Sequence, residues 1–130
     1  MQKKLSSGLR RKLLKSRARK IREGDKLLRE YVEKISRKYP KSTIILFGSR
    51  ARGDYLPYSD YDLVVVLQEV DDKISTIEEF RRLKPRGLPL DLLVIRVDEL
   101  SDPLILKMFR KCKILYNGLK INSKILNRQV

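Results

Sequence analysis

The chain has 130 residues, which fits one ordinary domain, and 42% of them are hydrophobic, enough to form a core. It carries 31 basic and 16 acidic side chains, for a net charge of +15, with no histidine and one cysteine, Cys112. This composition excludes a disulfide, a Cys/His zinc site and a nucleophile activated by histidine, so chemistry here must use carboxylates. The apolar runs are too short to cross a bilayer and no secretory signal is evident, so we expect a cytoplasmic protein.

The positive charge is concentrated near the N-terminus. Residues 1–41 hold 16 basic and 4 acidic side chains (+12), whereas residues 42–130 hold 15 and 12 (+3). Such a basic segment attracts polyanions by releasing their counterions, which makes RNA or DNA an expected partner. A dock for an acidic protein, or simply a solvated helical arm, is the alternative. We therefore divide the chain into a basic arm (1–22), helical or partly disordered, a domain (23–118) and a C-terminal tail (119–130).

The first predicted element is an amphipathic helix. Apolar residues at three- and four-residue spacing predict this helix from Ile21 to Lys38, and Pro40 ends it. Leu5, Leu9 and Leu13 continue the same rhythm toward the N-terminus. Because glycines and like charges weaken helices, however, residues 1–20 are predicted to form a weak helix that could be disordered when alone.

Strands and helices alternate along the rest of the chain. Hydrophobic and β-branched runs bounded by turn residues predict three strands, at Ser42–Phe47, Tyr61–Leu67 and Leu90–Val97. A short loop or helix follows the first strand. A helix between Asp71 and Leu83 follows the second.

The last predicted helix has Asp102 as its cap and runs to about Cys112. A short strand, Lys113–Tyr116, and a turn at Asn117 and Gly118 come after it. The whole order predicts an α/β fold, with flanking helices around one small mixed sheet.

A Gly-Ser pair ends the first strand. Glycine at position 48 would let the backbone approach a phosphate, while the Ser49 hydroxyl and neighbouring N–H groups would donate hydrogen bonds to it. Strands commonly end in such turns, so the pair indicates a phosphate site only in combination with other residues.

Carboxylates supply that combination. Asp60 and Asp62 enter the second strand one residue apart, so the strand period of two puts both on one face, where they repel unless a cation neutralises them. Asp91 is an isolated acid within the hydrophobic third strand. It either caps that strand or faces solvent at a sheet edge, or, if the second and third strands are neighbours, it completes an oxygen-rich cluster suited to Mg²⁺ or Mn²⁺.

Together these residues resemble the minimal nucleotidyltransferases of the polymerase β superfamily. The family signature, Gly-Ser-x10-Asp-x-Asp, is matched by Gly48, Ser49, Asp60 and Asp62, and the resemblance covers about residues 25–118. The resemblance implies a polymerase β-like core that transfers NMP from an NTP to an acceptor hydroxyl. The expected reaction is the transfer of AMP from ATP.

The same resemblance implies roles for the metal-binding residues. Asp60 and Asp62 would ligate two Mg²⁺ ions, with Mn²⁺ as a substitute. Asp91 would ligate the catalytic ion and help to deprotonate the incoming hydroxyl.

Phosphate and base contacts are implied around these carboxylates. Gly48 and Ser49 would hold the β and γ phosphates of the nucleotide. Arg52 is a candidate phosphate ligand and Arg50 a weaker one. Two aromatic side chains, Tyr55 and Tyr58, either flank the base or pack.

Larger members of this superfamily bind the acceptor with additional domains, whereas this chain has a catalytic core and a basic arm. We therefore expect a partner molecule to present the acceptor hydroxyl. Proteins similar to this one are paired with a small all-helical HEPN toxin-type RNase and act as antitoxins by adenylylating a tyrosine on it. Two alternatives stay open. The acceptor is RNA or tRNA, with residues 1–22 as a phosphate-binding arm, or the chain is a non-catalytic complex-forming or nucleic-acid-binding module of the same fold.

Overall fold

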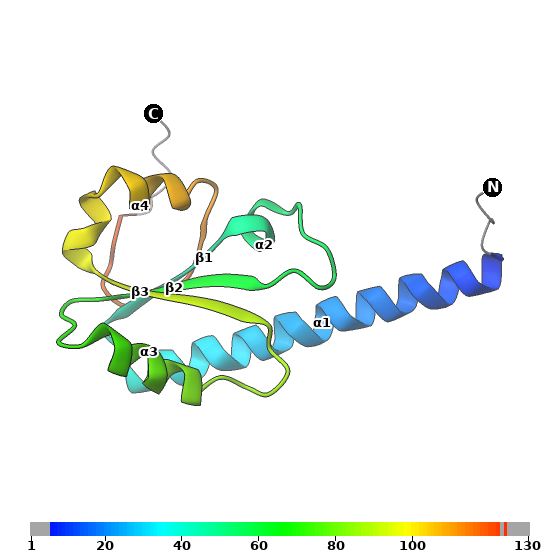
Figure 1. Ribbon diagram of the computed structural model, residues 1–130, viewed down its shortest axis with the longest axis horizontal. Coiled ribbons are helices and arrows are strands. Elements are labelled where there is room, and N and C mark those ends of the chain that lie inside the picture. Colours follow the sequence, from blue (N-terminus) through cyan, green and yellow to red (C-terminus); the bar gives the residue numbers. More distant parts are fainter. Residues whose placement is uncertain (1–5, 123, 125–130) are drawn as a thin grey trace.

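The computed structural model describes residues 6–122 and residue 124. A long helix, α1 (Ser7–Lys38), packs with its C-terminal half against one face of the sheet, and its N-terminal half extends well beyond the sheet (Figure 1). In the described part of the chain, no helix combines the length and apolar character needed to cross a membrane.

Four strands form the central sheet in the order β3-β2-β1-β4. Their bounds are Ser42–Phe47 (β1), Tyr61–Leu67 (β2), Leu90–Arg96 (β3) and Lys113–Asn117 (β4). β1 is antiparallel to both of its neighbours, whereas β2 and β3 run parallel. The expected α/β fold with a small mixed sheet is therefore confirmed.

Hydrophobic layers cover both faces of the sheet. Leu63 and Val65 of β2 pack in the layer that holds α1 and α3 (Lys73–Arg82). Val64 and Val66 pack in the opposite layer, with the 3-10 helix η1 (Val97–Ser101), and α4 (Pro103–Met108) lies on that side. Because strand side chains alternate between faces, Asp62 belongs to the α4 side of the sheet.

Residues 7–20 are helical, which is one of the two states expected for the basic arm, so the helix begins before Ile21. α1 begins at Ser7, with the Ser6 hydroxyl accepting a hydrogen bond from the Leu9 N–H at 3.2 Å. Arginine, lysine and leucine are strong helix formers, and their propensity outweighs the like charges and Gly8. The helix continues through residues 22 and 23 without a break. Leu5 lies outside the described residues.

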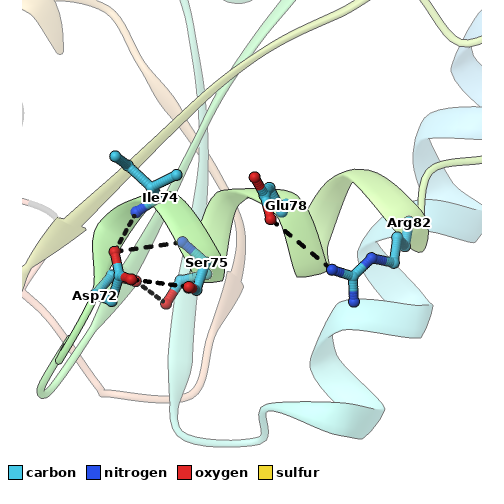
Figure 2. A network of polar contacts seen from close by, with 6 residues as sticks. Asp72, Ile74, Ser75, Glu78 and Arg82 are labelled. Carbon is cyan, nitrogen blue, oxygen red and sulfur yellow. Dashed lines mark hydrogen bonds and ion pairs between the residues drawn. The ribbon is translucent and has the colours of Figure 1, made fainter.

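α3 begins where the sequence predicts a helix, and its N-cap explains why. The Asp72 carboxylate accepts from the backbone N–H groups of Ile74 and Ser75 and from the Ser75 hydroxyl, the last at 2.8 Å (Figure 2). These bonds satisfy donors that have no partner within the helix. Glu78 and Arg82 form an exposed ion pair one turn further on.

Two bounds near the C-terminus are corrected by the structure. Asp102 caps α4 as predicted, but the helix ends at Met108, four residues before Cys112. Phe109 turns into the core next to Phe47, and Lys111 adopts a positive φ of 57°, so the helix cannot continue. The third strand also ends one residue early, at Arg96, because Val97 starts η1.

Candidate active site

Three aspartates lie at one end of the β2–β3 pair. Asp62 and Asp91 are direct partners in the parallel register, and Asp60 stands two residues before Asp62. The alternation of side chains puts Asp62 and Asp91 on the α4 side of the sheet, and Asp60, just before β2, is close enough for its charge to act on Asp62. Among the residues that the structure describes, none of the three carboxylates has a hydrogen-bond or ion-pair partner. Negative charge is thus gathered here without a direct ion pair.

The crowding changes the acidity of the half-buried member. Burial, and then the charges of Asp91 and Asp60, raise the pKa of Asp62, while Arg52 opposes the shift. No group of three acidic, histidine or cysteine side chains in the described ranges is arranged so that it could hold a metal ion as it stands. The aspartates are therefore neighbours at one edge and do not form a closed ligand set. Their oxygens are nevertheless the donors that Mg²⁺ prefers, and a cation would relieve their repulsion.

A glycine turn lies directly beside the carboxylates. Phe47, the last residue of β1, pairs with Asp62, and the short helix α2 (Gly48–Arg52) begins immediately after it. Gly48 has a φ of +72°, and a Cβ atom there would stand 2.1 Å from Oδ2 of Asp62. Only glycine fits both the backbone conformation and the space. The Gly-Ser turn and the Asp-x-Asp pair are therefore packed against each other.

Arg50 does not face this carboxylate edge. It is only 5% exposed, and its guanidinium lies between the rings of Tyr55 and Tyr61, 4.3 and 4.2 Å from their centroids. It donates to the Ser59 carbonyl at 3.0 Å and to the Pro57 carbonyl at 3.4 Å. Its Nη1 is buried without a hydrogen-bond partner.

Arg50 therefore serves a different purpose from the phosphate contact considered from sequence. Its hydrogen bonds fix the loop that runs from α2 to Asp60, and they end at the residue immediately before that aspartate. Sequence reasoning missed this role, because an arginine on a turn usually points to solvent. The nearby aromatic residues were the one available signal.

The remaining predicted side chains divide between packing and exposure. Arg52 is exposed, pairs with Asp54 at 3.4 Å and lies close enough to lower the pKa of Asp62, so it stays a candidate phosphate ligand. Tyr55 packs against Arg50. Tyr58 is 72% exposed, and the Lys20 ammonium of α1 lies 3.8 Å from its ring centroid.

The carboxylate edge is an open surface. Asp60 and Asp91 are exposed. A nearby cavity of about 260 Å³ is lined by residues that include Lys20, Arg50 and Tyr61, and it does not include the aspartates. Two of the three carboxylates can therefore be reached from solvent.

Comparisons with known proteins give this arrangement a family. The family model described as a nucleotidyltransferase domain matches residues 28–120, so the chain belongs to the nucleotidyltransferase domain family. This match confirms the resemblance inferred from the Gly-Ser and Asp-x-Asp residues and identifies an enzyme of the nucleotidyltransferase class. No curated protein matches the chain.

Two solved structures share the fold. A candidate nucleotidyltransferase from Sulfolobus solfataricus has 28% identity and a TM-score of 0.60, and the similarity covers 78% of this chain and 86% of that chain. A toxin–antitoxin structure with AMP-PNP has 21% identity and a TM-score of 0.54, covering 76% of this chain and 80% of that chain. At the lower identity the likeness establishes the fold alone.

Proposed function

We propose that this protein transfers AMP from ATP to an acceptor hydroxyl, with Asp60, Asp62 and Asp91 as the metal ligands. The observation that carries the proposal is the direct pairing of Asp62 with Asp91 beside the Gly48 turn. It brings three carboxylates without hydrogen-bond partners among the described residues and the tight turn at the start of α2 to one edge. Such an edge can bind the phosphates of a nucleotide only with cations between the two sets of negative charge.

Each group in the proposed site has a distinct task. Divalent ions, when bound, would supply charge neutralisation at the α-phosphate and the leaving pyrophosphate and would favour the ionised form of the acceptor hydroxyl. Gly48 and Ser49 would hold the β and γ phosphates, because the turn admits close approach of an oxygen. Asp91, the exposed carboxylate on the edge strand, would accept the acceptor's proton. Arg52 would add a positive charge next to the phosphates.

The acceptor we favour is a tyrosine on a partner protein. The open edge leaves room for a macromolecular acceptor, and the fold is shared with a toxin–antitoxin complex that holds AMP-PNP. With the family resemblance, this supports a small helical HEPN-type toxin as the partner and an antitoxin role for the chain. The AMP-PNP in that complex also favours ATP as the nucleotide. Two Mg²⁺ ions as its companions are implied by the family resemblance alone.

RNA is the second candidate acceptor. The observation that favours it is the charge of α1, where residues 7–22 carry eight basic and no acidic side chains. Lys20 also links this helix to Tyr58, two residues before Asp60. An RNA bound along α1 would therefore reach the carboxylate edge.

Labelled ATP distinguishes these acceptors. The purified protein is incubated with α-labelled ATP and Mg²⁺, once with the protein encoded beside it and once with bulk tRNA. We expect label on the partner protein, and label on tRNA alone would move the acceptor to RNA. Asp54→Asn, in the same loop but outside the cluster, is the matched control for Asp60→Asn. If both variants or neither lose activity, the assignment of the site is wrong.

A further inference from the structure

α1 presents a straight line of cations that the proposed chemistry does not use. Six exposed basic residues follow one another at intervals of three or four, and we call them the basic stripe: Arg11, Lys15, Arg19, Arg22, Lys26 and Arg29. The line begins in the projecting half of the helix and continues into the half that packs on the sheet (Figure 1).

Helical geometry places the basic stripe on the side away from the domain. At 100° per residue, its six members fall within about 80° of one another and cover about 27 Å along the axis. The buried residues of α1 point the opposite way: Gly24, Leu28, Tyr31 and Ile35. The basic stripe is therefore open to solvent along its whole length.

No acid neutralises this line. Within the described residues, none of the six cations takes part in an ion pair or a hydrogen bond between side chains. The next charged residue along the same face, Glu33, forms an ion pair with Arg37. Like charges one turn apart, such as Arg11 and Lys15, destabilise a free helix. A linear anion laid along the basic stripe would turn that repulsion into attraction.

We infer that the basic stripe binds the sugar-phosphate backbone of a nucleic acid. Phosphates recur at regular intervals along a strand, which matches a row of cations, and their binding releases counterions. A protein partner would need apolar residues at the centre of its contact, and the basic stripe contains none. The projecting half also exposes three leucines, Leu9, Leu13 and Leu14, all of which lie outside the basic stripe. Leu13 lies on the side of α1 that faces the sheet further along, with Leu9 and Leu14 on its two flanks.

This site is separate from the proposed transfer reaction. Binding at the basic stripe needs neither nucleotide nor metal. It is independent of base sequence, because contacts to the sugar-phosphate backbone carry no sequence information. The stripe begins at Arg11, in the part of α1 that projects beyond the sheet (Figure 1). Binding can be measured on protein without ATP, and its failure would remove RNA as an acceptor while leaving transfer to a protein acceptor untouched.

Two variants with equal net charge test the inference. The stripe variant changes Lys15, Arg19, Arg22 and Lys26 to Gln. The dispersed variant changes four other exposed cations to Gln: Arg10, Arg17, Lys107 and Arg110. The full chain is titrated into a labelled, unstructured RNA and into labelled polyglutamate of similar length, at salt concentrations between about 50 and 200 mM. Circular dichroism checks that both variants stay folded.

The expected result is a difference between the two variants. The stripe variant should lose about tenfold or more in RNA affinity, and the dispersed variant much less. For the unchanged protein, with four to six phosphates bound, log K should fall with log salt at a slope of about −3 to −4. Equal losses in the two variants would mean that net charge alone drives binding and would overturn the inference. Polyglutamate bound as tightly as RNA would also overturn it, by showing a general acidic dock.

Discussion

Like charges are crowded in two regions of this molecule, and the two are built in opposite ways. At the carboxylate edge, Asp62 and Asp91 are held by the register of two paired strands, and Asp60 directly precedes one of them. On α1, six cations stand on one exposed helix face. The first arrangement fixes each group relative to the others, whereas long flexible side chains on a helix adapt to what they meet.

This difference matters for function. Transfer chemistry needs groups fixed to within a fraction of an ångström, which a sheet edge and a glycine turn supply. Binding a polyanion needs only charge along a line, which a single helix supplies. Repulsion between like charges therefore indicates a ligand in both regions, and the rigidity of the scaffold indicates which ligand must be placed accurately.

The largest effect should come from removing a carboxylate. Asp62→Asn should lower nucleotide transfer by roughly a thousandfold or more, because several kcal/mol of transition-state stabilisation depend on the metal charge held there. In the presence of a chelator the variant should be as stable as the unchanged protein or more so, since the substitution removes a charge whose burial, and then its repulsion by Asp91 and Asp60, raise the pKa of Asp62. Transfer assays and thermal melts with EDTA measure the two results. Undiminished activity would remove Asp62 from the site.

Two glycines separate the effect of backbone strain from the effect of the close contact between the α2 turn and Asp62. Gly48 and Gly53 both have positive φ, but only at Gly48 would a Cβ meet Asp62. Gly53→Ala should cost about 1–2 kcal/mol of unfolding free energy, from backbone strain alone. Gly48→Ala should cost more and should also reduce transfer by displacing the carboxylate. Denaturant unfolding and activity of the folded fraction test this, and equal behaviour of the two variants would contradict it.

Variants of Arg50 and Arg52 distinguish support of the loop between α2 and Asp60 from contact with phosphate. Arg50→Lys removes the planar fork and the stacking between two tyrosines, so we expect a loss of about 1.5–3 kcal/mol in unfolding free energy. Arg52→Lys, at an exposed position, should leave stability unchanged and raise the KM for ATP. Melting curves and steady-state kinetics decide between them. A stable Arg50→Lys variant would show that the hydrogen bonds to Ser59 and Pro57 do not hold the loop.

The smallest effect concerns α3, far from both charged regions. Hydrogen bonds from Ser75 and Ile74 hold the pKa of Asp72 below its usual 3.8. A carboxyl whose pKa is lowered by folding stabilises the fold above the usual pKa, and this contribution disappears as the pH falls through the lowered value. Asp72→Ala should therefore melt slightly lower at neutral pH and match the unchanged protein in strong acid. A constant difference across that range would show that Asp72 does not act through its charge.

The sequence predicted the sheet better than the helices. β1 and β2 begin and end where their buried β-branched runs do, because turn residues flank both runs. For the projecting half of α1 the sequence left helix and partial disorder open, because helix propensity and repulsion between like charges oppose each other there. The early end of α4 depends on Phe109 turning into the core, which is a tertiary effect.

The candidate site divides in the same way. Gly48, Ser49, Asp60 and Asp62 follow from local spacing, and their positions are set by one strand pair. Asp91 stayed open in the sequence because its place depends on which strand lies beside β2. The buried position of Arg50 could not be derived at all, because its partners come from the fold.

The most direct test of the central claim compares ATP labelled at the α-phosphate with ATP labelled at the γ-phosphate, each incubated with the full chain, Mg²⁺ and the acceptor. If the carboxylate edge performs nucleotidyl transfer, the α label moves to the acceptor and the γ label leaves as pyrophosphate. Asp54→Asn should leave this pattern unchanged, and Asp62→Asn should abolish it. Transfer of the γ label to the acceptor would contradict the account, because it would make the reaction a phosphoryl transfer.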